Sequence, residues 1–187
     1  MPRKSTEIAE KNTQKEMSKA SKKTPKASRP YMPGYGLPKS SKGLLPWKWA
    51  EERLKKNHNY WVTTVKPDGA PHTMIVWGLW IDGAFCFGTG RQSRKAKNLA
   101  ARPQCAIATE RADQAVIVEG VAEEVSDVTF RRRYLKDYER KYKFDMSAFE
   151  KDILNLKEPI YVVRPLVAFG LDEKKFMTAT TRWKFAG

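Results

Sequence analysis

The segment with the clearest chemistry runs from residue 88 to residue 99, GTGRQSRKAKNL. Ser93 stands where the N-cap of a short helix is expected. A helix start has unpaired N–H groups and a partial positive charge, so acidic residues are normally favoured there. The charged residues in this segment are instead all basic, and no acid occurs between Asp82 and Glu110. The basic residues nearest to the helix start are Arg91, Arg94 and Lys95.

A bound phosphate would make this arrangement of like charges favourable. Thr89 and Ser93 add hydroxyl donors, and Lys95 and Asn98 are three residues apart, on one face of the helix. The segment therefore predicts a phosphate site, with a plain solvated basic helix as the alternative. Because neither a Walker motif nor a GxGxxG motif is present, the phosphate should belong to something other than a Rossmann-bound dinucleotide.

No set of side chains in the sequence forms a familiar catalytic group. His72 begins a strand and is more often structural than a base in such a place, and His58 stands in a polar stretch. Cys86 and Cys105 are isolated from each other and from both histidines, so we expect neither a disulfide framework nor a zinc site. If the protein is an enzyme, a cofactor should carry out the difficult step, and the catalytic residue stays unassigned.

The elements around the predicted phosphate site have the two-residue period of strands. Two hairpins in succession, with turns at residues 66–69 and 82–83, predict an antiparallel meander. On the strand expected for residues 73–81, alternating aromatic and branched residues form a wall that would suit a flat cofactor with a phosphate tail. Barrel core is the alternative for the same residues. We predict strands at 60–65, 73–81, 84–87, 105–109, 115–125 (with a bulge at Gly120) and 159–171, and helices at 47–56, 93–101, 127–143 and 149–156.

The chain has 187 residues, room for one ordinary domain and a tail. It carries 36 basic and 21 acidic residues, and residues 17–43 contain no acid and are rich in Lys, Ser and Pro. We therefore expect residues 1–30 to be a disordered basic arm and residues 31–187 to form the domain. The arm could contact nucleic acid non-specifically through charge, or serve only as a solubilising tail. No apolar run is long enough to span a bilayer, no secretory signal is evident, and the cytoplasm is the expected location.

Five segments in order along the chain resemble the pyridoxamine-phosphate-oxidase-like, FMN-binding split-barrel family, in particular its flavin/deazaflavin oxidoreductase branch. The resemblance extends from about Tyr31 to Phe185. Two features of some family members are absent: the additional C-terminal arginine and histidine pattern of true pyridoxamine-phosphate oxidases, and the histidine-bearing extension of the haem proteins. The segments are YWVTTVKPDGAPH (60–72), VWGLW (76–80), SRKAKNL (93–99), VEG (118–120) and ATTRWKF (179–185).

This resemblance implies a mainly β fold, a six-stranded antiparallel split barrel with peripheral helices. It implies a homodimer with two cofactor sites at the subunit interface and FMN, or the deazaflavin coenzyme F-420, as the cofactor. The strand around Val76 and Trp77 matches the one that lies against the ring, and His72, Arg182 and Trp183 are candidates for substrate contact or site closure. The residues that match the phosphate-holding segment are Arg91, Ser93, Arg94, Lys95 and Asn98, with Thr89 beside them.

The function expected from these observations is hydride transfer between a flavin-type cofactor and a small organic molecule. The alternative is a non-catalytic flavin-binding or nucleic-acid-associated barrel module.

Overall fold

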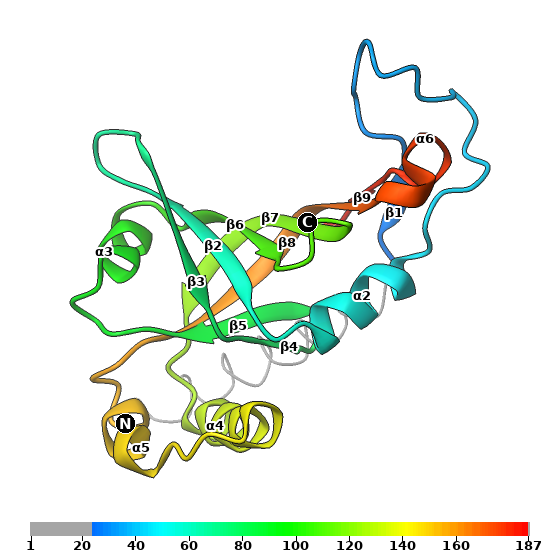
Figure 1. The fold of residues 1–187 in the computed structure, drawn as a ribbon. Helices are drawn as coiled ribbons and strands as arrows, with labels where there is room; N and C mark the ends of the chain where they lie inside the picture. Colours follow the sequence, from blue (N-terminus) through cyan, green and yellow to red (C-terminus); the bar gives the residue numbers. More distant parts are fainter. Residues whose placement is uncertain (1–23, 187) are drawn as a thin grey trace, which may run out of the picture.

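A single antiparallel sheet dominates the computed structural model, which describes residues 24–186 (Figure 1). The strand order is β1-β9-β8-β7-β6-β2-β3, and β5 pairs with both β8 and β4. The sheet curls into a barrel that is not closed, because β3 has β2 as its only partner in the described part of the chain. The strands are β1 (Lys26–Ser28), β2 (Tyr60–Val65), β3 (Pro71–Val76), β4 (Leu79–Ile81), β5 (Ala84–Gly88), β6 (Gln104–Thr109), β7 (Gln114–Glu124), β8 (Ile160–Asp172) and β9 (Thr181–Lys184).

The mainly β barrel fold with peripheral helices is confirmed, but its strands are divided differently from the prediction. The prediction of a single strand for residues 73–81 is wrong. The chain bends at Trp77 and Gly78, and this bend separates β3 from β4. A Cβ at Gly78 would overlap the Phe85 ring, so only glycine permits this bend. With β1 and β9 added at one edge, residues 24–186 contain nine strands rather than six.

The N-terminal boundary of the ordered domain also lies earlier than expected. Lys26–Ser28 form β1 and pair with β9, so the strand lies inside the segment predicted to be a disordered arm. Arg29, the residue after β1, holds this segment against residues 178–180 by donating to the carbonyl oxygens of Thr178 and Thr180 at 2.8 and 3.0 Å. The rest of the predicted arm, residues 1–23, lies outside the described residues.

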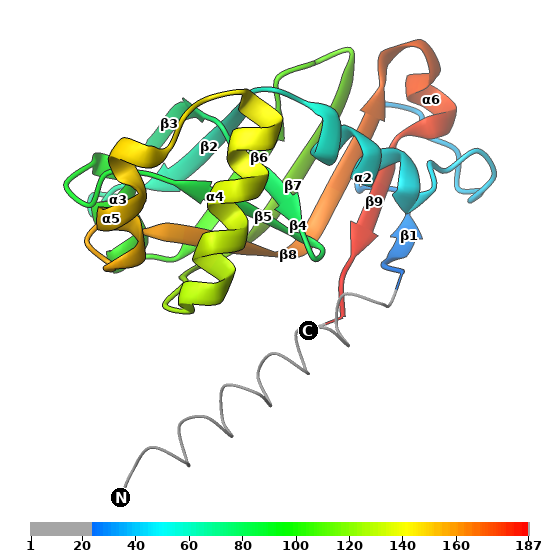
Figure 2. The same cartoon turned by 90° about the horizontal axis from the view of Figure 1, so that it is seen from below.

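Five α-helices and one short 3-10 helix surround the sheet in the described part of the chain. Side chains cap two of them: Ser93 caps α3, as predicted, and the Asp127 carboxylate caps α4 by accepting from the N–H groups of Thr129 and Phe130. α3 lies beside β2 and β3, while α4 and α5 lie together across β4 and β5 (Figures 1 and 2). The helices are α2 (Trp47–Lys56), α3 (Arg94–Ala101), α4 (Val128–Tyr142), α5 (Ser147–Leu154), η1 (Glu173–Lys175) and α6 (Phe176–Ala179).

Strand β8 separates two hydrophobic cores, because its side chains alternate between its two faces. Val163 faces the core inside the barrel, and its neighbour Val162 faces the core between the sheet and α4. The predicted bulge at Gly120 is confirmed: the register of β7 against β8 shifts between Glu119 and Gly120, opposite Pro165, which has no N–H to donate.

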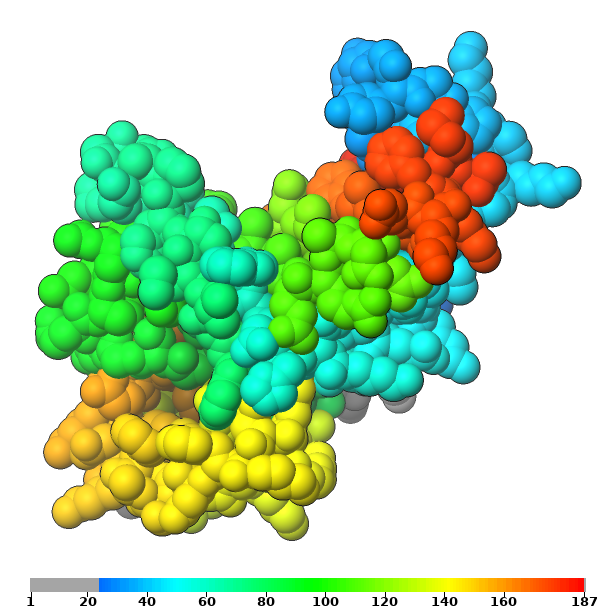
Figure 3. Space-filling model, viewed as in Figure 1, coloured from blue at the N-terminus to red at the C-terminus, as the bar shows by residue number. Residues whose placement is uncertain are grey.

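The outer face of the molecule is hollowed between two projections (Figure 3). One projection is the β2–β3 hairpin, and the other is the lobe of α6 with residues 30–43. None of the helices within residues 24–186 has the length and apolar character needed to cross a membrane.

Candidate functional site

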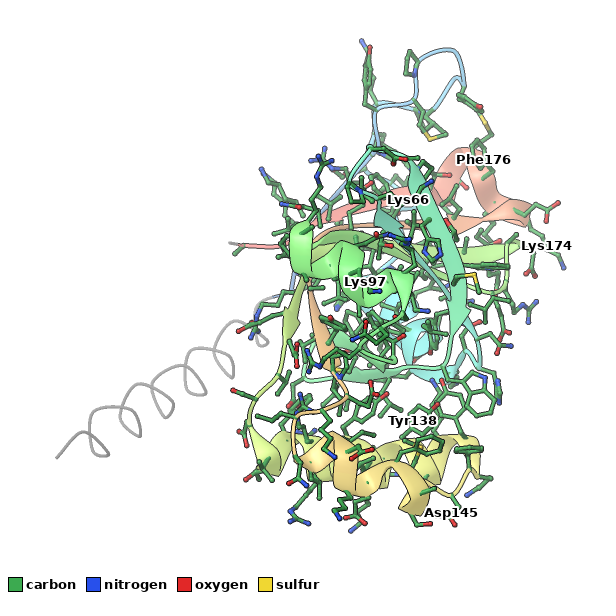
Figure 4. The ribbon with its side chains drawn as sticks, turned by 90° about the vertical axis from the view of Figure 1, so that its left-hand side faces the viewer. Lys66, Lys97, Tyr138, Asp145, Lys174 and Phe176 are labelled. Carbon is green, nitrogen blue, oxygen red and sulfur yellow. The ribbon has the colours of Figure 1, made fainter. Side chains whose placement is uncertain are left out.

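The N-terminus of α3 has the geometry that the sequence predicts. Ser93 Oγ accepts from the N–H of Ala96 at 3.2 Å, and it lies 3.1 Å from Thr89 Oγ1. The backbone between these residues turns tightly, since the N–H of Ser93 donates to the Gly90 carbonyl at 2.9 Å. Figure 4 shows α3 in front of the sheet, with the exposed Lys97 labelled on it. Thr89, Ser93 and the first turn of α3 are therefore brought together as expected.

Arg94 and Lys95 are cations without an anionic partner in residues 24–186: no carboxylate lies within ion-pair distance of either. Arg94 is exposed and Lys95 is half-buried. Burial lowers the pKa of the Lys95 ammonium, because its charged form is partly removed from water. The backbone N–H groups of the same two residues have no acceptor within the described part of the chain either. An anion at this point would satisfy both the side chains and the backbone.

Arg91 is placed differently from its two basic neighbours. Its guanidinium forms a bidentate ion pair with Glu124, at 2.6 and 3.2 Å. This contact raises the pKa of the Arg91 guanidinium. Glu158 also lies at this loop, where it accepts from the Arg91 backbone N–H at 2.6 Å. The sequence did not indicate these two acids as partners of Arg91, because both lie far from it along the chain. Only the fold brings them into contact.

Asn98 does not present its amide nitrogen to the N-terminus of α3. The side chain is wholly buried, and its Nδ2 donates to Thr64 Oγ1 at 3.0 Å. Its Oδ1 is buried without a partner within residues 24–186. Thr64 is a contact that the motif search missed, although the two-residue period of β2 places it on the inner face with Tyr60 and Val62.

His72 contacts the same threonine as Asn98. It is the direct cross-strand neighbour of Thr64, whose hydroxyl donates to the His72 carbonyl at 3.4 Å. The Nδ1 of His72 is also buried without a partner among the described residues. His72 and Asn98, which both contact Thr64, thus each have one buried polar atom without a partner in the described residues, although buried polar groups normally find one.

Trp77 packs against α4 and does not continue the strand that contains Val76. Its ring stacks on Tyr142 with centroids 4.6 Å apart and planes within 2° of parallel. Its Nε1 donates to Asn59 Oδ1 at 3.1 Å. Val76 is buried and pairs with Tyr60 across β2 and β3. The expected continuous wall of residues 73–81 is therefore interrupted at Trp77.

Arg182 and Trp183 lie at the end of the sheet that is remote from α3 (Figure 1). Trp183 is fully buried in the barrel core and packs edge-on against Trp47, with centroids 5.4 Å apart. Arg182 points outward and lines a groove of about 410 Å³ together with Glu119, Phe169 and residues 30–32. Within one chain, these two residues do not meet the N-terminus of α3.

The described residues hold no cluster of three His, Cys, Asp or Glu side chains that could bind a metal ion. Both cysteines are buried, and burial raises the pKa of each thiol to about 12. A thiolate nucleophile is therefore not available in this part of the chain at neutral pH. The groups left without partners within residues 24–186 at the start of α3, two cationic side chains and their backbone N–H donors, have the chemistry that an anion requires.

The chain resembles known proteins over most of its length. Among solved structures it is similar to an F420 reductase (27% identity, TM-score 0.53, 63% of this chain and 94% of the other). It is also similar in fold to a conserved hypothetical protein of Mycobacterium tuberculosis (22% identity, TM-score 0.64, 73% and 90%). A heme binding protein of Mycobacterium smegmatis has the same fold (20% identity, TM-score 0.51, 68% and 55%).

No curated protein matches the sequence. The family model for pyridoxamine 5'-phosphate oxidase matches residues 47–158, which is more than half of the chain and includes all of β2 to β7 and α3. The chain therefore belongs to the pyridoxamine 5'-phosphate oxidase family.

Proposed function

We propose that the protein is an oxidoreductase that binds FMN, or the deazaflavin coenzyme F-420, with its phosphate at the N-terminus of α3. The observation that carries the proposal is the pair of cations, Arg94 and Lys95, whose side chains and backbone N–H groups have no anionic partner within residues 24–186. Membership of the family and the similarity to an F420 reductase support the same cofactor class.

The residues of this chain fit such a cofactor. Arg94, Lys95 and the N–H groups of the first turn of α3 would hold the phosphate, with the hydroxyls of Thr89 and Ser93 beside them. The unsatisfied His72 Nδ1 and Asn98 Oδ1 offer one ring nitrogen and one acceptor for polar groups of a ligand or a bound water. When bound, the flavin or deazaflavin ring supplies the hydride chemistry, while the protein binds and orients the reactants and excludes water.

An apolar row across the sheet supports a homodimer. Trp61 and Ile75 are cross-strand neighbours on the outer face, and 42% and 51% of their surfaces are exposed. Their row continues in register toward the groove at the other end of the sheet. A second copy placed on this face would cover the row and bring the groove of one chain toward α3 of the other. The apolar row consists of Ile75, Trp61, Ala108, Ile117 and Phe169, and Arg182 follows it in register at the groove.

The visible spectrum of the purified protein tests the cofactor class. Bound FMN gives two absorption bands and the deazaflavin gives one, and a protein without colour is titrated with each. Uptake of either one with a phosphate-dependent affinity is the expected result. A protein that takes up neither, or that takes up haem instead, would contradict the oxidoreductase proposal and favour a non-catalytic binding module.

The dimer is tested separately by sedimentation. Replacing Ile75 with glutamate should convert the protein to monomers, because the charge would be buried in the apolar interface. Val128→Glu is the matched control, since Val128 is an apolar residue on α4 with 42% of its surface exposed. Dimers that persist in Ile75→Glu, or a wild-type protein that is already monomeric, would show that this face is not the interface.

A further inference from the structure

The guanidinium of Arg91 is held from two directions. Besides its bidentate pair with Glu124, it donates to the main chain that precedes β8: Nη2 to the Leu156 carbonyl at 2.8 Å, and Nε to the Lys157 carbonyl at 2.7 Å. All four contacts use the planar fork of donors of the guanidinium, two to the Glu124 carboxylate and two to backbone carbonyls. Its position is therefore fixed by the fold, and it points toward residues 156–157 and Glu124.

Glu124 also forms an ion pair with a second arginine, which is buried. Its carboxylate lies 3.6 Å from Nη2 of Arg131, a residue of α4 with no exposed surface. The Arg131 guanidinium also donates to three carbonyl oxygens, those of Val125, Ile153 and Glu158, at 2.7, 2.6 and 2.8 Å. Burial lowers the pKa of Arg131, whereas Glu124 raises it. A buried cation of this kind needs its nearby anion.

Glu158 attaches the loop before α3 to the same network. Its Oε2 accepts from the Arg91 backbone N–H at 2.6 Å, while its own carbonyl accepts from Arg131. The loop is held a second time, where the N–H of Thr89 donates to the Pro159 carbonyl at 3.4 Å. Residues 88–93 are thus fixed by side chains of β7 and α4 and by the segment between α5 and β8. We call Arg91, Glu124, Arg131 and Glu158 the arginine network.

The arginine network is balanced in charge, with two arginines and two carboxylates, and its Arg91 guanidinium is fully engaged. We propose that Glu124 and Arg131 are positioning residues, which hold Arg91 and thereby fix the loop that leads into α3. The loop in turn directs the phosphate-binding side chains of α3 toward the cofactor, so the inference rests on the proposed function. Arg91 itself then acts by shaping the loop and does not contact the phosphate.

The test compares a ligand that has a phosphate with one that does not. In Glu124→Gln the carboxylate loses its charge but keeps its shape, so the loop should lose its anchor while the barrel stays folded. FMN affinity, measured by quenching of flavin fluorescence, should fall about tenfold. Riboflavin, which has the same ring but no phosphate, should bind with unchanged affinity. If the wild type binds the deazaflavin instead, that coenzyme and its phosphate-free chromophore replace the pair.

Glu123→Gln is the matched control, because Glu123 precedes Glu124 on β7 and pairs with the exposed side of Arg164 at 3.2 Å. It should leave both affinities unchanged. The double variant Glu124→Gln/Arg91→Gln should bind FMN no more weakly than Glu124→Gln, because both changes remove one interaction. If Glu124→Gln does not fold, Arg91→Lys replaces it, since lysine keeps the charge but loses the fork.

Three results would overturn the inference. Glu124→Gln could keep the wild-type preference for FMN over riboflavin, it could lose both ligands equally, or its effect could add fully to that of Arg91→Gln. The last result would mean that Arg91 contacts the phosphate directly. A wild-type protein that binds neither flavin nor deazaflavin is a different result, because it contradicts the proposed function before any variant is made.

Discussion

Arg91 and Arg94 stand three positions apart at the start of one helix, yet their surroundings differ. Arg91 has Glu124 at 2.6 Å and two carbonyl acceptors, whereas Arg94 has no acidic partner within residues 24–186. Arg131 resembles Arg91 in that it donates to backbone carbonyls, three of them, and lies beside Glu124, although it is fully buried and its Nη2 lies 3.6 Å from the carboxylate without a hydrogen bond to it. Lys95 resembles Arg94. The protein thus has two sets of cations in different environments. Those of the arginine network stabilise the fold, whereas those in the first turn of α3 are available to bind an anion.

This difference separates two properties that are often linked. Removing a cation from the arginine network should cost folding free energy as well as phosphate affinity, whereas removing one from the first turn of α3 should cost ligand affinity and leave folding almost unchanged. A stability measurement and a binding measurement on the same variants therefore distinguish the two sets.

The largest effect is expected for Arg131→Met. The change removes the three hydrogen bonds that Arg131 donates to backbone carbonyls and leaves Glu124 without its buried partner, so the free energy of unfolding should fall by about 3 to 5 kcal/mol. Urea denaturation of the cofactor-free protein measures it. The control is Arg132→Met on the same helix, where the exposed side chain lies 3.9 Å from Glu150 and should contribute less than about 0.5 kcal/mol. Equal stabilities of the two variants would mean that the network does not hold the fold.

The next effect concerns affinity. Arg94→Ala and Lys95→Ala should each weaken cofactor binding by about 1.5 to 3 kcal/mol, the range for charge-assisted hydrogen bonds. The stability of the cofactor-free protein should stay the same or rise slightly, because Lys95 is a partly desolvated cation whose pKa burial already lowers. Fluorescence titration and urea denaturation give the two values. Lys97→Ala, an exposed position on the same helix, should change neither, and an unchanged affinity in both test variants would place the phosphate elsewhere.

Much of the α3 region could be predicted because its determinants are local. Twelve consecutive positions contain a serine N-cap, a glycine-flanked turn and a run of basic residues. The structure has the cap and the turn. The fold class followed from the two-residue period and the turns, in the same way. The cap of α4 is local in the same way, since Asp127 accepts from the N–H groups of residues two and three positions later.

The remainder depends on contacts between distant segments. Arg91 meets Glu124 and Glu158 only because β5 pairs with β8, which places Gly88 opposite Ile160. Helical spacing put Lys95 and Asn98 on one face, but Asn98 turns inward with its apolar neighbours and reaches Thr64 instead. A glycine at position 78 could have indicated the bend between β3 and β4, but only the Phe85 ring behind it makes a side chain impossible there.

Lys141 is a cation in a third kind of environment, with neutral hydrogen-bond acceptors and no carboxylate partner in the described residues. Its ammonium donates to the hydroxyl of Tyr60 at 2.8 Å and to the Gly78 carbonyl at 2.9 Å, which are neutral acceptors. Burial lowers its pKa to about 8, and the nearby Glu110 opposes the shift only weakly. The folded protein therefore holds this proton less tightly than the unfolded chain, in which a lysine titrates near 10.4.

The sign of this shift gives the smallest expected effect. As the pH rises from about 8 toward 10, the unfolded chain keeps the proton that the folded protein has released, so stability should increase. The gain should be on the order of 1 kcal/mol after allowance for solvent around the half-exposed amine. Above this window the buried hydroxyls of Tyr60 and Tyr142, whose pKa values burial raises, reverse the trend.

Urea denaturation at several pH values measures the slope. Lys141→Met should abolish the rise, and Lys136→Met, exposed on the same helix, should retain it. A rise that persists in Lys141→Met would assign the titration to another group. A wild-type protein that loses stability over the same window would mean that the charged form of Lys141 is stabilised by its surroundings, as that of Arg91 is by Glu124.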